Sequence, residues 1–124
     1  GVREICDRAG TLLIVDEVQT GFGRTGKLFA VEHFGLRPDL MTLAKGIAGG
    51  VPMGATLMRA SVAEKIRPGV HGSTFGGNPL AAAAAIATLD VLAEEDLPRQ
   101  AAEKGEYLLA ALRDLPSPII RQVR

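Results

Sequence analysis

Two side chains that could do chemistry each stand directly after an apolar run. Asp16 follows residues 11–15 (TLLIV), and Lys45 follows residues 40–44 (LMTLA). Short continuous apolar runs are typical of strands that are buried on both faces of a parallel sheet. Ligands of open α/β sheets bind outside the carboxyl ends of the strands, so we expect Asp16 and Lys45 to face one pocket.

An amine and a carboxylate in one pocket suit an aldehyde cofactor that carries a basic aromatic ring. Lys45 could hold the aldehyde as a Schiff base and, once the substrate amine has displaced it, could move a proton at the substrate carbon. The Asp16 carboxylate would keep the ring nitrogen protonated, because opposite charges roughly 4 Å apart attract by about 4 kcal/mol at an effective dielectric of about 20. Taken singly, a solvated lysine and a turn-capping aspartate are the competing interpretations.

Strands and helices alternate around these two residues. We expect a first helix that ends at Gly10, a third strand over residues 55–58 and no regular element over the glycine-rich residues 46–52. Asn78 and Pro79 predict the N-cap and the first residue of a firm helix. The expected helices after the first cover residues 27–34, 61–65 with Ser61 as N-cap, 80–94 and 99–112.

Residues 21–26 (GFGRTG) match the glycine pattern of dinucleotide-binding loops and, with Lys27, nearly match a Walker A motif. A dinucleotide-binding loop begins directly after its strand, whereas residues 17–20 intervene here. A Walker A motif also needs a Ser or Thr hydroxyl at the position of Leu28. We therefore interpret this segment as a flexible active-site loop and not as a nucleotide site.

The composition excludes several classes of partner. Fourteen Lys and Arg residues balance fourteen Asp and Glu residues, so no net charge recruits nucleic acid or an anionic membrane. No apolar run approaches the roughly 20 residues of a membrane span, and the N-terminus lacks a signal-peptide layout, so we expect a soluble, cytoplasmic protein.

Cys6 is expected to pack in the core. Because both ends fall within apparent elements, we expect a fragment.

Three segments in order resemble the signatures of class III pyridoxal-phosphate-dependent aminotransferases. They are residues 16–21 (DEVQTG), 43–46 (LAKG) and 71–79 (HGSTFGGNP). The resemblance runs from about residue 11 to residue 92 and is greatest to the acetylornithine and ornithine-type members.

This resemblance implies the fold and the domain organisation. The fold would be α/β, part of the large domain of a fold-type I transferase that depends on pyridoxal 5'-phosphate (PLP), with a mainly parallel sheet and flanking helices. Residues 1–115 would belong to this PLP-binding domain, and residues 116–124 would begin the connection to a C-terminal small domain.

The same resemblance implies a set of cofactor-binding residues. Asp16 would pair with the pyridine nitrogen, Val18 would pack against the ring face and Gln19 would approach the ring hydroxyl. Lys45 would form the Schiff base, and Glu17 is counted with the cofactor-binding residues because it lies within the same signature. Lys45 and Asp16 would be the catalytic pair, and no metal ligand is assigned.

Ser73 and Thr74 extend the implied site to a second subunit. Thr74 would donate a hydrogen bond to the cofactor phosphate of the opposite subunit, and Ser73 would lie near the substrate. A homodimer with a shared active site follows from the resemblance. From the residues alone, a plain glycine turn before a helix is the competing interpretation.

The implied activity is amino-group transfer from N-acetylornithine, or a similar ω-amino donor, to 2-oxoglutarate in arginine biosynthesis. The alternatives are another class III PLP enzyme, such as an ornithine or other ω-amino-acid aminotransferase or an aminomutase, and a non-catalytic dimer-interface segment. The family's main phosphate-binding turn and its substrate-carboxylate arginine are not found in these residues. We therefore expect the 124-residue chain alone to be inactive.

Overall fold

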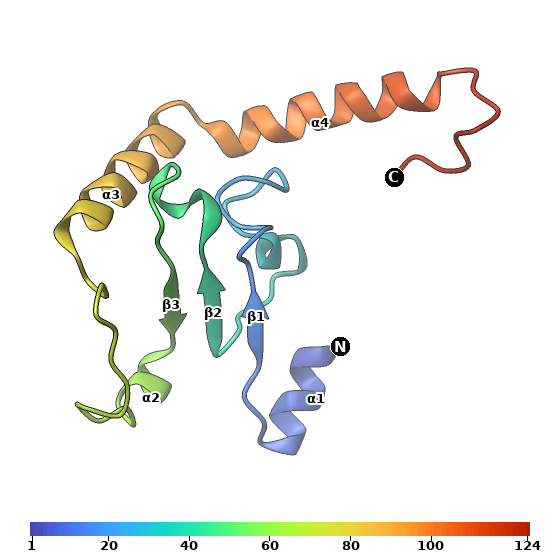
Figure 1. The fold of residues 1–124 in the computed structure, drawn as a ribbon. Coiled ribbons are helices and arrows are strands. Elements are labelled where there is room, and N and C mark those ends of the chain that lie inside the picture. Colours follow the sequence, from blue (N-terminus) through green and yellow to red (C-terminus); the bar gives the residue numbers. More distant parts are fainter.

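The computed structural model describes residues 1–124 and has a three-stranded sheet at its centre (Figure 1). The strands lie in the order β1 (Ile14–Asp16), β2 (Leu40–Leu43) and β3 (Ala55–Met58). β1 and β2 run parallel, whereas β3 runs antiparallel to β2. The predicted α/β class is confirmed, and the part of the sheet that this chain contributes is mixed.

Helices surround the sheet, and α3 and α4 lie near the end where β1 and β2 finish (Figure 1). None of the helices is both long and apolar enough to cross a lipid bilayer. In chain order they are α1 (Val2–Ala9), the 3₁₀ helices η1 (Ala30–Phe34) and η2 (Lys45–Ala48), α2 (Ala60–Ala63), α3 (Pro79–Glu94) and α4 (Leu97–Arg113).

The predicted helix signals at Gly10 and Asn78 are confirmed. Gly10 adopts a left-handed conformation with φ 63° and ends α1, as a C-terminal glycine does where a side chain would be strained. The Asn78 side chain accepts a hydrogen bond of 2.9 Å from the Ala81 amide, and Pro79 is the first residue of α3. Side-chain capping therefore fixes where the loop before α3 ends.

Two local predictions are wrong. Ser61 does not cap its helix, because the Arg59 amide still bonds to the Asp39 carbonyl at the end of β3 and α2 then starts at Ala60. Residues 46–52 also contain regular structure, since η2 covers Lys45–Ala48 and is followed by Gly49, which is left-handed with φ 60°.

The core lies where β2 and η2 pack against α3. Its buried members are Val31, Met41, Leu43, Ile47, Ala48 and Ala85. β1 contributes less than predicted, because Ile14 is 60% exposed. The expected burial of this strand on both faces is wrong, because Val15 packs against the core whereas the Ile14 side chain is exposed.

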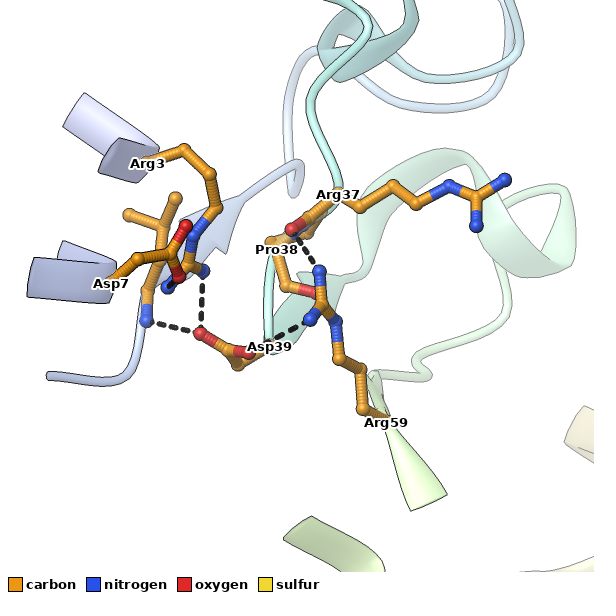
Figure 2. Close-up of polar contacts among 7 residues, drawn as sticks. Arg3, Asp7, Arg37, Pro38, Asp39 and Arg59 are labelled. Atoms are coloured by element: carbon orange, nitrogen blue, oxygen red, sulfur yellow. Dashed lines mark hydrogen bonds and ion pairs between the residues drawn. The ribbon is translucent and has the colours of Figure 1, made fainter. Parts of the chain in front are cut away.

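An ionic cluster around Asp39 ties α1 to the sheet (Figure 2). Asp39 directly precedes β2, whereas Lys45 lies beyond the other end of this strand. The Asp39 carboxylate accepts bonds from Arg3 Nη1 at 2.6 Å and from the Leu13 amide at 2.8 Å, and Arg59 Nη1 lies 3.5 Å away. The Leu13 amide and then the Arg3 guanidinium hold the pKa of Asp39 below its usual value. This cluster is therefore structural.

Candidate active site

A cleft of about 650 Å³ opens where β1 and β2 end. Its walls come from the turn after β1, the glycine loop at residues 21–24, the start of η2 and the junction of α3 with α4. In Figure 1 these segments meet at the upper end of the sheet, toward which both parallel strands point. The cleft thus lies at the carboxyl ends of the strands, as expected for an α/β sheet.

Lys45 lines this cleft and is held in an uncommon conformation. Its backbone is left-handed, with φ 50°, which costs a residue with a side chain about 1–2 kcal/mol. Its Nζ donates a hydrogen bond to Oε1 of Gln19. Strained residues cluster at functional sites, so this conformation favours a chemical role for Lys45 over that of a solvated surface lysine.

Asp16 is fixed at the end of β1 through one of its two carboxylate oxygens. Asp16 pairs with Thr42 in the β1–β2 register, and its Oδ1 accepts bonds from Thr42 Oγ1 at 3.2 Å and from the Val18 amide at 2.8 Å. No protein donor reaches Oδ2. The carboxylate is therefore oriented while one oxygen stays available to a ligand.

The two contacts between the strand ends follow one another along the chain. Asp16 meets Thr42, and three residues later on each segment Gln19 meets Lys45. The structure thus brings the predicted acid and amine to the same end of neighbouring strands. Lys45, Gln19 and Val18 line the cleft, whereas Asp16 itself stands just outside that lining.

Glu17 points away from the cleft. Its side chain is 0% exposed, and its carboxylate accepts bonds from the amides of Ala30 at 3.0 Å and Val31 at 2.8 Å and from the Thr20 hydroxyl. All of these side-chain contacts lie within the chain, and a cofactor contact of Glu17 stays a prediction. Its carboxylate joins the turn after β1 to the start of η1.

The glycines of residues 21–26 have a packing explanation. A Cβ atom on Gly26 would lie 2.9 Å from the Ala102 Cβ, and one on Gly23 would lie 3.3 Å from the Pro98 Cγ. Both glycines also have φ 89°, which side chains rarely adopt. The loop therefore needs glycine in order to approach α4, and this accounts for the partial nucleotide-motif match.

Phe22 and Arg24 line the cleft, which agrees with the interpretation of residues 21–26 as an active-site loop, although neither residue was singled out. Phe22 is left-handed with φ 58°, and its ring packs edge-on against Phe29 with centroids 5.9 Å apart. The only available signal was an aromatic residue between two glycines. The flanking glycines let the Phe22 backbone adopt its left-handed conformation, while its ring packs against Phe29.

Ser73 and Thr74 do not join Lys45 within one chain. They lie in the exposed loop before α3, where Ser73 lines a separate hollow of about 340 Å³ with residues 52–54. Phe75, in the same loop, is 80% exposed. The predicted site is therefore divided over two places on the chain.

Comparison with known proteins shows one consistent family. The model of the class III aminotransferase family matches residues 1–124. The chain is 56% identical over 122 residues to a [LysW]-aminoadipate semialdehyde transaminase of Deinococcus radiodurans, covering 98% of the chain and 28% of the relative. It is 53% identical over 123 residues to an acetylornithine aminotransferase of Methanopyrus kandleri, covering 99% and 31%.

Solved structures show the same likeness in three dimensions. An ornithine aminotransferase of Toxoplasma gondii, crystallised with partial occupancy of PLP at its active site, superposes with a TM-score of 0.93. The two are 44% identical, and the match covers 98% of this chain and 30% of that one. The chain thus spans less than a third of the length of these proteins.

Proposed function

The chain belongs to the class III aminotransferases, and from this premise we propose that the natural protein containing it is a PLP-dependent enzyme. It would transfer an amino group from N-acetylornithine, or a similar ω-amino donor, to 2-oxoglutarate. The observation that carries the proposal is the meeting of Lys45, Gln19 and Asp16 at the ends of two parallel strands.

The residues present fit the cofactor. A PLP ring needs an amine for its aldehyde carbon, an acidic partner for its ring nitrogen and a polar partner for its hydroxyl. Lys45 supplies the amine, the free Oδ2 of Asp16 supplies an acceptor, and the Gln19 amide lies beside the amine. Val18, which also lines the cleft, offers an apolar face for the ring.

When bound, PLP supplies an electron-withdrawing ring that stabilises negative charge on the substrate carbon. Lys45 would anchor the cofactor and then, freed by the substrate, carry a proton to and from that carbon. Asp16 would keep the ring nitrogen protonated, and its bonds from Val18 and Thr42 would hold it in place for this task. Gln19 would accept a bond from the lysine and orient it.

We assign the remaining site residues to a homodimer. Ser73 and Thr74 are exposed and separate from the Lys45 cleft in one chain, so a second subunit could use them without rearrangement. Thr74 would donate to the phosphate of the partner's cofactor, and Ser73 would lie near the substrate. Residues 1–115 would form part of the PLP-binding large domain, and residues 116–124 would lead to a small domain.

The identity of the amino donor is the most specific part of the proposal. The two relatives compared above are named for acetylornithine and for [LysW]-aminoadipate semialdehyde. Transamination interconverts an aldehyde and an amine. In both substrates the reacting group lies at the far end of a chain, so an ω-amine is the amino form in each case. We place the enzyme in arginine biosynthesis and in the cytoplasm.

An assay of the natural protein with PLP tests this function. Glutamate formed from 2-oxoglutarate is measured with N-acetylornithine, ornithine or a diamine as donor. We expect N-acetylornithine to give the highest kcat/KM and Lys45→Ala to abolish turnover. Absence of amino transfer from every ω-amine would overturn the proposal.

A further inference from the structure

The buried carboxylate of Glu17 is an unusual feature so close to an exposed cleft. Its side chain is 0% exposed and has no Lys or Arg partner. Burying a carboxylate is costly unless hydrogen bonds satisfy it. Here three donors do so, namely the amides of Ala30 and Val31 and the hydroxyl of Thr20.

The contacts of Glu17 fix a turn at both ends. Its amide donates to the Thr42 carbonyl at 3.0 Å, which extends the pairing of β1 with β2. Its carbonyl accepts from the Gly21 amide at 2.9 Å, which closes the turn over residues 17–21. A Cβ on Gly21 would lie 2.8 Å from that carbonyl, so only glycine fits this closure.

The side chain then anchors this turn to η1. Val18 and Gln19 lie in this turn and line the cleft. Glu17, which directly precedes them, makes the contacts that hold the turn against η1. We propose that Glu17 is a positioning residue, whose buried carboxylate sets where Val18 and Gln19 stand relative to Lys45. This inference rests on the proposed cofactor function.

Glutamine cannot replace Glu17, although its shape is the same. Oε1 accepts from the Val31 amide, and Oε2 accepts from the Ala30 amide and the Thr20 hydroxyl. In either orientation, the NH₂ group of Gln would face a backbone N–H donor. Glu17→Gln should therefore move the turn, whereas most solvent-exposed Glu to Gln changes would not.

Glu32 offers a control, because it also bonds to the start of η1. Its Oε1 accepts from the Phe29 amide at 2.7 Å, so it caps the start of η1 without touching the turn. Glu32→Ala removes this bond at the same helix end. A purely structural role for Glu17 would make the two variants behave alike.

The experiment measures PLP affinity and visible circular dichroism of the bound cofactor in the natural protein, well below its melting temperature. We expect Glu17→Gln to raise the PLP dissociation constant about tenfold or more and to change the dichroic band. Glu32→Ala should lower the melting temperature but leave both cofactor readings unchanged. Equal affinity and dichroism in unmodified protein and Glu17→Gln would overturn the inference.

Thr20 keeps the test decisive if Glu17→Gln does not fold. Thr20→Val removes the hydroxyl that bonds Glu17 and should weaken PLP binding about threefold, whereas Thr20→Ser should restore it. Unchanged affinity in Thr20→Val would then count against the inference. If unmodified protein bound no PLP at all, the proposed function itself would fail, and the two failures are thereby distinguishable.

Discussion

Lys45 donates a hydrogen bond from Nζ to Oε1 of Gln19, which joins the residue after β2 to the turn after β1. Three residues earlier, Thr42 makes the corresponding link to Asp16. An amine, an amide and a carboxylate are therefore held at one edge of two parallel strands.

Asp16→Asn should reduce turnover more than it reduces stability. Asparagine can still accept from the Val18 amide and Thr42, but it carries no negative charge to keep a ring nitrogen protonated. We expect kcat of the natural protein to fall about 10²–10³-fold. Steady-state kinetics with saturating PLP measures this, with the exposed Asp114→Asn as control. A kcat within a factor of about two of the unmodified enzyme would refute this role.

Gly26→Ala should destabilise the protein far more than Gly35→Ala. Both positions are left-handed, at φ 89° and 58°, but a Cβ on Gly26 would lie 2.9 Å from Ala102 while one on Gly35 meets no atom within 4 Å. We expect a loss of about 2–4 kcal/mol for Gly26→Ala and about 1 kcal/mol for Gly35→Ala. Chemical denaturation gives both values. Equal losses would show that contact with α4 does not matter.

Asp39→Asn should alter the acid stability of the protein. The Leu13 amide and Arg3 lower the pKa of Asp39 below its ordinary value of 3.8, so the ionised carboxylate stabilises the folded state above that pH. This stabilisation is lost as the pH falls through the folded-state pKa. The melting temperatures of unmodified protein and Asp39→Asn, measured from about pH 7 to pH 2, should therefore converge below pH 3.8. A constant difference across the range would contradict this assignment.

Local signals predicted the elements that carry the site. Continuous apolar runs predicted β1 and β2, a left-handed glycine ended α1, and Asn78 with Pro79 began α3. These features depend on a few neighbouring residues, so the sequence alone contains them. The positions of Asp16 and Lys45 at strand ends followed from the same runs.

Features that depend on distant contacts could not be predicted in this way. The antiparallel direction of β3, the exposure of Ile14 and the closeness of Gly26 to α4 each require knowledge of which segments meet. The environment of Glu17 is another case. Its carboxylate binds amides 13 and 14 residues away, and no local signal in the sequence indicates those partners.

Mixed dimers test the shared active site. If Thr74 serves the partner's cofactor, a dimer of one Lys45→Ala subunit and one Thr74→Val subunit contains one site with both native residues. We expect that site to bind PLP with unmodified affinity, at one PLP per dimer. Differently tagged subunits allow purification of the mixed dimer and titration with PLP. A weakened affinity, like that of the Thr74→Val homodimer, would mean that each subunit uses its own Thr74.

The most direct test of the central claim is covalent labelling of the natural protein with PLP. Borohydride reduction followed by peptide mass spectrometry locates the lysine that the cofactor occupies. We predict one labelled peptide containing Lys45, loss of label and of the visible cofactor absorbance in Lys45→Ala, and no change in Lys27→Ala. Label on another lysine, or undiminished absorbance in Lys45→Ala, would contradict the assignment of Lys45 as the cofactor's anchor.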